Sequence, residues 1–135
     1  MAVVDASVLV ALLAEEEHAG WAESQLSAGG RRRALWAPHL IDAEVGHSLR
    51  RLVVAGKLGG DHAAAALDDL ADVPLRRVVH TGLLERAWQL RHNLSFYDGL
   101  YVALAEQLDT PLLTLDNRLA KAAGDNTGVT VLTAS

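Results

Sequence analysis

The sequence predicts an α/β fold in which a parallel β-sheet is flanked by helices on both faces. Two observations support this prediction. Short apolar runs alternate along the chain with longer segments of helical periodicity, as in strand–helix–strand units joined by right-handed crossovers. The first run, at residues 2–4, leads directly into a helix-like pattern, as a parallel strand leads into its crossover helix.

Length and composition fit a single domain over residues 1–135. The chain is 50% hydrophobic, which is enough apolar surface for a core. It contains no cysteine, which excludes a disulfide framework and a thiolate zinc site and agrees with a reducing compartment, so we expect the cytoplasm. The net charge of −5 argues against nucleic-acid binding through bulk charge, although basic groups such as 31–33 leave room for a local basic surface.

No segment has the pattern of a targeting or membrane sequence. The apolar N-terminus lacks a basic region, contains Asp5 and is followed by the acidic run 15–17, unlike a signal peptide. No later segment approaches the ~20 uninterrupted apolar residues that a bilayer span needs. We therefore expect no association with membranes.

The first half of the chain is expected to contain two strands and their helices. Pro38 should lie in the first turn of a long helix whose apolar residues recur until Gly56, and Asp61 should cap the helix after it. The expected elements are a strand at 2–4, helices at 8–13 and 18–25, a loop at 31–33, a strand at 34–37, a helix from 38 to about 53 and a helix at 63–70.

The second half repeats the alternation of strands and helices. The run after Pro74 is less cleanly apolar than the first strand, so we expect it towards an edge of the sheet. Asn93 is expected to end one helix, and Ser95 to open the next. The expected elements are a strand at 75–79, helices at 81–91 and 95–108, a strand at 111–115, a helix at 119–123 and a strand at 129–132.

Four acidic residues occupy unusual places in this pattern. Asp5 and Asp116 follow short apolar strands, whereas Glu44 and Asp98 lie on or beside buried helix faces. Each has a structural explanation by itself: the two strand-end acids can cap helices, Glu44 can be an edge residue, and Asp98 can complete a capping box opened by Ser95. Capping does not readily explain all four together, and ligands of open α/β sheets bind beyond the carboxyl ends of the strands.

If the four acids converge, their mutual repulsion raises their pKa values or requires cations. Mg²⁺ and Mn²⁺ prefer oxygen ligands and are typically held by a few carboxylates, with water and substrate phosphate completing the shell. Such a site can activate water for attack on phosphorus. The acids therefore suggest metal-dependent phosphodiester hydrolysis.

Four segments together resemble the PIN domain, and most closely the VapC toxins of bacterial toxin–antitoxin pairs. The resemblance covers essentially the whole chain, with the segments in the right order. They are Val3-Val4-Asp5-Ala6-Ser7, Ile41-Asp42-Ala43-Glu44-Val45, Ser95 to Ala105 with Ser-Phe-Tyr-Asp-Gly at its start, and Leu113-Thr114-Leu115-Asp116-Asn117-Arg118-Leu119.

The resemblance implies a PIN-like α/β/α fold and a Mg²⁺- or Mn²⁺-dependent ribonuclease. It also implies the partners of such a toxin, namely an RNA substrate, a cognate VapB-type antitoxin and a second copy of the chain in a homodimer. The residues that match the catalytic, metal-binding acids of the family are Asp5, Glu44, Asp98 and Asp116.

Further residues match supporting positions or depart from the family pattern. Ser7 and Thr114 match hydroxyl positions that support the acids, and Asn117 is a further supporting candidate. His47 stands where many relatives have a small polar amide, one turn after the helical glutamate. Asn117 and Arg118 stand where some relatives have another acid. These departures leave the surroundings of the site and a second metal position open.

Three other interpretations compete with a ribonuclease. Glu15/His18 and Glu44/His47 have the spacing of carboxylate-bridged di-iron bundles, but such a bundle needs two more glutamates on two further long helices. A receiver-like phospho-acceptor domain also gathers strand-end acids and Mg²⁺, but the late strand ending in Asp116 offers no lysine for the phosphoryl group. A degenerate PIN domain that only binds a partner is the third, and the intact acids argue against it.

Overall fold

Five parallel strands form the central sheet, in the order β5–β4–β1–β6–β7. The computed structural model describes residues 1–28 and 30–134. The predicted parallel sheet is confirmed, and the strand after Pro74, β5, lies at its edge as expected. The strands of the sheet are β1 (Ala2–Val4), β4 (Leu35–Pro38), β5 (Leu75–Val78), β6 (Leu112–Leu113) and β7 (Val131–Leu132).

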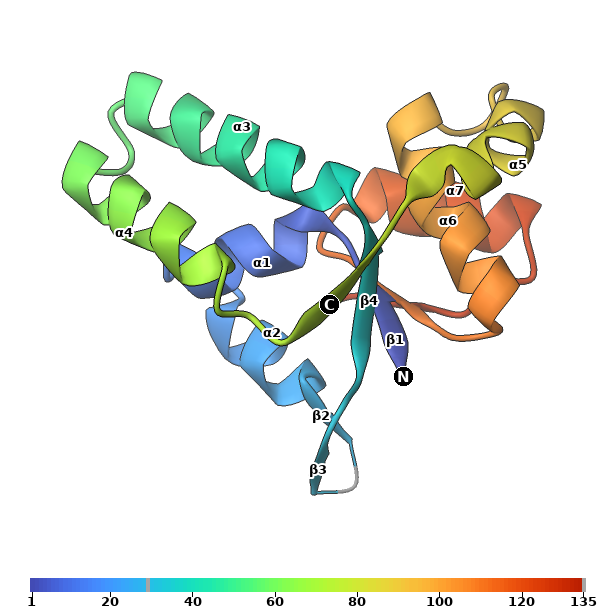
Figure 1. The fold of residues 1–135 in the computed structure, drawn as a ribbon, viewed down its shortest axis with the longest axis horizontal. Helices are drawn as coiled ribbons and strands as arrows, with labels where there is room; N and C mark the ends of the chain where they lie inside the picture. Colours follow the sequence, from blue (N-terminus) through green and yellow to red (C-terminus); the bar gives the residue numbers. More distant parts are fainter. Residues whose placement is uncertain (29, 135) are drawn as a thin grey trace.

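Helices cover both faces of this sheet, as the sequence predicts. Figure 1 shows α1 to α4 on one side of β1 and β4, and α5 to α7 on the other. The first group comprises α1 (Ala6–Leu13), α2 (Ala19–Gln25), α3 (Leu40–Val54) and α4 (Gly60–Leu70). The second comprises α5 (Leu84–Gln89), which follows the 3₁₀ helix η1 (His80–Leu83), together with α6 (Phe96–Leu108) and α7 (Asn117–Asn126).

The core comprises buried residues of the central strands, of α6 on one face of the sheet and of α1 and α3 on the other. All three residues of β1 are fully buried, and every residue of α6 from Gly99 to Ala105 is buried. Helix α6 packs on β1, β4 and β6, and α5 packs on α6. At Gly99 a side chain would meet the backbone of Ala87 at 3.2 Å, so the absence of a Cβ permits this close approach of the two helices.

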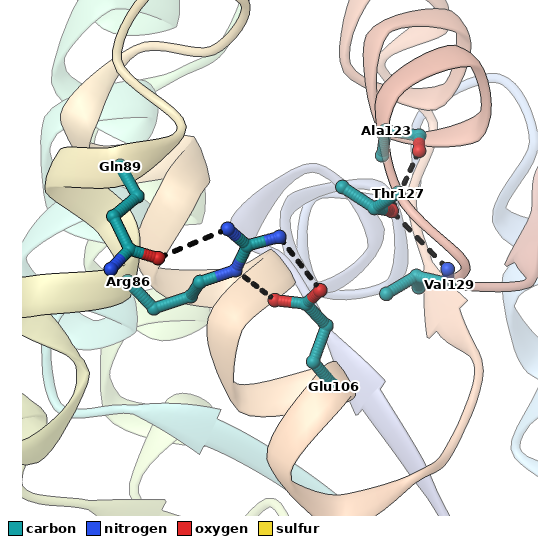
Figure 2. A network of polar contacts seen from close by, with 6 residues as sticks. All are labelled: Arg86, Gln89, Glu106, Ala123, Thr127 and Val129. Atoms are coloured by element: carbon teal, nitrogen blue, oxygen red, sulfur yellow. Dashed lines mark hydrogen bonds and ion pairs between the residues drawn. The ribbon is translucent and has the colours of Figure 1, made fainter.

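Polar contacts join α5 to α6 outside the core. Arg86 donates from Nε to Glu106 Oε1 at 2.8 Å and from Nη2 to Oε2 at 3.1 Å, while Nη1 donates to Gln89 (Figure 2). The paired contacts match the planar guanidinium to the carboxylate. They hold the outer surface of α5 against the helix that carries Asp98.

The prediction of a loop at 31–33 is wrong for its first two residues. Strand β3 (Arg31–Arg32) pairs antiparallel with β2 (Ser27–Ala28) in a hairpin that projects from the body of the molecule (Figure 1). Gly30 has a positive φ of 78°, which suits the turn of such a hairpin. Both arginines are exposed, so no apolar alternation marks the strand in the sequence.

The prediction that Pro38 lies in a first helical turn is also wrong. Pro38 is the last residue of β4, where it pairs with Val78, and α3 begins two residues later. The amide of His39 donates to the Val78 carbonyl at 2.9 Å. Because amides alternate sides along a strand, the missing N–H of Pro38 does not interrupt the bonding to β5.

The predicted helix at 81–91 consists of two shorter elements. The 3₁₀ helix η1 precedes α5, and Gly82 within η1 lowers the preference of this stretch for a continuous α-helix. Helix α5 ends at Gln89, with Leu90 as its C-cap instead of the predicted Asn93. Similarly, Gly59 and not Asp61 caps α4, while Asp61 lies in its first turn, where a carboxylate is favourable to the helix dipole.

Near the C-terminus, α7 is longer and β7 shorter than predicted. Thr127 ends α7, donating to the Ala123 carbonyl at 2.7 Å and accepting from the Val129 amide at 3.2 Å (Figure 2). These contacts turn the chain into β7. Across residues 1–28 and 30–134, none of the helices combines the length and apolarity that crossing a membrane would require.

Candidate functional site

Asp5 lies directly beyond the carboxyl end of β1, the central strand. It is 6% exposed and caps α1, because its Oδ1 accepts from the amides of Ser7 at 3.1 Å and Val8 at 3.4 Å. Two hydroxyls complete its contacts. Ser7 Oγ donates to Oδ1 at 2.5 Å, and Thr114 Oγ1 donates to Oδ2 at 2.5 Å. The carboxylate is therefore held in one orientation from both sides.

The same hydroxyls fix the segment that follows β6. Ser7 Oγ accepts from the Leu115 amide at 2.8 Å, and Thr114 Oγ1 accepts from the Asp116 amide at 3.0 Å. The two hydroxyl oxygens are 3.5 Å apart. Ser7 and Thr114, both expected to support the acids, thus tie the end of β1 to the end of β6 and set the position of Asp116.

Asp116 follows this segment and caps α7. Its Oδ1 accepts from the amides of Arg118 at 2.9 Å and Leu119 at 3.2 Å, and the residue is exposed. The capping role proposed for strand-end acids is therefore present at both Asp5 and Asp116. Since only Oδ1 of Asp116 is used among the described contacts, its second oxygen remains available to a ligand.

Glu44 lies on α3 at the border of its buried stripe, as the helical pattern predicts. It is half-buried, and its Oε1 accepts from the hydroxyl of Tyr101 at 2.6 Å. Tyr101 belongs to α6, which packs on the opposite face of the sheet (Figure 1). No role for Tyr101 at the site is predicted from the sequence. The single signal was a phenol on a stripe that is otherwise aliphatic.

Asp98 lies in the first turn of α6 and is half-buried. Ser95 caps this helix, since its Oγ accepts from the Asp98 amide at 3.1 Å. An open cleft of about 470 Å³ contains the side chains of both Asp98 and Asp116. The cleft is lined by Asn93, Leu94, Ser95, Asp98, Asp116, Arg118, Leu119 and Ala122.

The acids influence one another electrostatically. Burial raises the pKa of Asp5 to about 6, against the hydrogen bonds from Ser7, Thr114 and Val8, and the charge of Asp98 raises it further. Burial also raises the pKa of Glu44, with Asp98 again adding to the rise, while the Tyr101 hydroxyl lowers it. Asp98 therefore lies within electrostatic reach of both.

The pKa of Asp98 itself is raised, first by burial and then by the charge of Asp116, while the Ser95 hydroxyl and Arg118 oppose the rise. The charge of Asp98 thus interacts with the charges of the other three acids, Asp5, Glu44 and Asp116. A cation near these groups would relieve both the burial cost and the mutual repulsion.

The donor chemistry fits Mg²⁺ or Mn²⁺. All four candidate groups are carboxylates, and hydroxyl or amide donors leave at least one oxygen of Glu44 and Asp116 unused within the described residues. In the described ranges, however, no three acidic or histidine side chains are gathered closely enough to hold one ion by themselves. Mg²⁺ commonly takes only one or two carboxylates and completes its shell with water and substrate oxygens.

Three residues that depart from the family pattern lie around these acids. His47 is exposed one turn after Glu44 on α3, and its charge lowers the pKa of Glu44. Asn117 and Arg118 are exposed at the start of α7, and Arg118 lines the cleft beside Asp98. Asn117 makes no side-chain hydrogen bond within the part of the chain that the structure describes, so its supporting role stays a prediction.

The di-iron interpretation does not agree with this structure. Glu15 and His18 lie between α1 and α2, both with positive φ, and not on a long helix. Their side chains are exposed, away from the core of the molecule. The pair therefore lacks the helical setting that the motif requires.

Comparison with known proteins agrees with the resemblance in the sequence. The family model "PIN domain" matches residues 2–125. Ribonuclease VapC1 of Mycobacterium tuberculosis is 57% identical over 89 residues, which cover 65% of this chain and 67% of that protein. A VapC ribonuclease of Mycobacterium bovis is 40% identical over 132 residues, or 98% of each chain.

Solved structures show the same fold. VapC20 of Mycobacterium tuberculosis, described as a Sarcin–Ricin loop cleaving toxin, has a TM-score of 0.68 at 23% identity, covering 90% of this chain and 95% of that one. VapBC2 of Rickettsia felis, bound to a DNA fragment from its promoter, has a TM-score of 0.67 at 10% identity, covering 99% and 98%. From the match of the family model and the identity with full-length VapC relatives, we conclude that the chain belongs to the PIN domain family, in its VapC group.

Proposed function

We propose that the chain is a Mg²⁺- or Mn²⁺-dependent endoribonuclease that acts as the toxin of a toxin–antitoxin pair. The observation that carries the proposal is the electrostatic interaction of Asp98 with three other carboxylates, those of Asp5, Glu44 and Asp116, which come from different elements. Two hydroxyls hold the Asp5 carboxylate in place. The names of the VapC relatives, which are ribonucleases, support the substrate class.

In this proposal Asp5, Glu44, Asp98 and Asp116 hold the cation, together with substrate oxygens. A bound Mg²⁺ or Mn²⁺ would supply Lewis-acid polarisation of the phosphodiester and lower the pKa of water. The protein contributes the positioning. Ser7 and Thr114 hold Asp5, and burial raises the pKa values of Asp5 and Glu44 above their ordinary values, so that a cation would relieve a cost already present in the fold.

The test is RNA cleavage by the purified chain after EDTA treatment, with and without added Mg²⁺ or Mn²⁺. We expect cleavage to require the added metal. Asp5→Asn should abolish cleavage while the chain stays folded, because the amide retains the Oδ1 contacts that cap α1. Activity that resists EDTA and does not respond to metal would contradict the proposal.

Two controls separate the alternatives. A receiver-like domain would instead form a stable aspartyl-phosphate with a small phosphodonor, whereas a degenerate PIN domain would show neither cleavage nor phosphorylation. Cleavage that is lost in Asp5→Asn but kept in Tyr97→Phe would exclude a contaminating nuclease, since Tyr97 is exposed and outside the acid cluster.

We also propose a VapB-type antitoxin and a homodimer as the chain's protein partners, and the cytoplasm, where RNA and such an antitoxin are available, as its location. A toxin–antitoxin complex of Klebsiella pneumoniae shares the fold, with a TM-score of 0.66 at 17% identity over 98% of this chain and 97% of that one. An acidic site attracts a basic side chain, so an arginine or lysine of the antitoxin is expected to pair with Asp98 or Asp116 and displace the cation.

A further inference from the structure

We propose that Tyr101 is a positioning residue for Glu44. In this role its hydroxyl fixes one oxygen of the Glu44 carboxylate and leaves the other for the cation and substrate. The inference rests on the proposed function and adds a residue to it, because Tyr101 is not among the site residues that the sequence predicts.

The contact is short and isolated from solvent on the tyrosine side. Tyr101 is 1% exposed, and its hydroxyl donates to Glu44 Oε1 at 2.6 Å. Within the described residues this is the one hydrogen bond of the Glu44 carboxylate. Without it, a half-buried glutamate on a helix surface would be free to take several rotamers.

The hydroxyl lies among three of the four acids. Burial, the hydrogen bond to Glu44 and the charges of Glu44, Asp5 and Asp98 all raise the pKa of Tyr101, in that order of effect. The short contact and the buried position of the ring place the phenol hydroxyl as a donor to Glu44.

A neutral donor has a particular advantage here. A lysine or arginine in the same place would orient Glu44 equally well but would cancel its charge and compete with a divalent cation. A phenylalanine would fill the same space in the core but would leave Glu44 without a partner. Tyrosine supplies the ring that the stripe needs and a hydrogen bond that keeps the carboxylate negative.

The bond also joins two parts of the fold. Glu44 is on α3 and Tyr101 on α6, helices that cover opposite faces of the sheet (Figure 1). The pair meets at the carboxyl edge, where Asp5 lies between the two helical layers. The bond thus ties Glu44 to the helix that carries Asp98.

The test is Tyr101→Phe, which keeps the buried ring. Mn²⁺ binding is measured by calorimetry on the metal-free protein, beside RNA cleavage. We expect Mn²⁺ affinity to fall by about tenfold, as for other residues that orient a ligand, and kcat to fall while KM for RNA stays unchanged. The matched control is Tyr97→Phe, one turn earlier on α6 and 58% exposed, which should bind Mn²⁺ as the unmodified chain does.

A double variant shows whether Tyr101 acts through Glu44. Adding Tyr101→Phe to Glu44→Ala should cause no further loss of Mn²⁺ affinity. Unchanged Mn²⁺ affinity in Tyr101→Phe, or an additive loss in the double variant, would overturn the inference. If the unmodified chain itself binds no Mn²⁺, the proposed function fails instead, and the role of Tyr101 fails with it.

Discussion

Asp5 caps α1 with one carboxylate oxygen and contacts Thr114 with the other. Capping and metal binding are therefore compatible at this residue, although they compete as explanations of the sequence. The contacts to Oδ2 leave room for a further ligand, because a carboxylate oxygen can accept more than one bond. The structural role of the residue gives the candidate ligand a fixed position.

The pH dependence of Asp5 provides a prediction. Its pKa in the folded chain, about 6, is above the ordinary value of 3.8, so the metal-free fold takes up a proton between these values. The contribution of this proton to the free energy of unfolding is fully present below pH 3.8 and is lost as the pH rises through about 6. Mn²⁺ needs the charged form, so its affinity should fall about tenfold per pH unit below pH 6 and level off above it.

Thermal melting of metal-free protein and calorimetric Mn²⁺ titrations, both across this pH range, measure the two effects. In Asp5→Asn the contribution of this group to the metal-free melting profile should disappear. A Mn²⁺ affinity that is constant between pH 5 and pH 7 would show that Asp5 does not need to ionise for binding.

Asp98 and Ser95 allow capping to be separated from metal binding. Ser95→Ala removes the acceptor for the Asp98 amide, so stability should fall by about 0.5–2 kcal/mol with cleavage retained. Asp98→Asn keeps that amide and removes a charge that burial and Asp116 disfavour. Its metal-free melting temperature should stay the same or rise, while stabilisation by Mn²⁺ and cleavage are lost.

The measurement is the melting temperature of both variants with and without Mn²⁺, beside an RNA cleavage assay. An Asp98→Asn protein that is less stable than the unmodified chain and fully active would refute the assignment of Asp98 as a metal ligand.

At the scale of elements, α7 contributes both its capping carboxylate and a positively charged side chain to the cleft. Asp116 caps the helix, and Arg118 in its first turn lines the cleft beside Asp98. A bound RNA strand must bring its phosphates close to these acids. A nearby positively charged side chain would offset the repulsion between the phosphates and the carboxylates. Arg118 is therefore expected to contact a phosphate next to the cleavage position.

Arg118→Gln should weaken RNA binding several-fold. In the inactive Asp5→Asn background, the slope of log affinity against log salt should become shallower by about 0.7. The control is Lys121→Gln, on the same helix, because Lys121 is 80% exposed and paired with Asp125 outside the cleft. Equal losses in the two variants would point to a general effect of charge.

Elements marked by runs of buried apolar residues could be predicted from the sequence. Contacts between residues that are far apart in the sequence could not. The strands at 2–4 and 112–113 are buried apolar runs, and their ends identify Asp5 and Asp116. The exposed strand at 31–32 and the proline at the end of β4 depend on pairing with other strands, which the local sequence does not encode.

The same distinction between predictable positions and unpredictable contacts applies to the candidate site. The positions of the acids on strand ends and helix faces could be predicted from spacing, and the hydroxyls of Ser7 and Thr114 from resemblance. The bond between Tyr101 and Glu44 joins residues 57 positions apart on different helices, so no periodicity of either helix indicates it. The tight approach of α5 at Gly99 is similar, because it depends on Ala87 of another helix.

At the scale of the whole molecule, the order of the strands has a consequence for synthesis. The first strand of the chain, β1, occupies the middle of the sheet, and one of its two neighbours, β6, begins only at Leu112. The bond between Asp5 and Thr114 spans 109 positions, and such long-range pairings form late and slowly. A chain still emerging from the ribosome therefore carries its acids unassembled, and the proposed nuclease would first become competent after the segment from Leu112 to Asp116 has been made and has paired with β1.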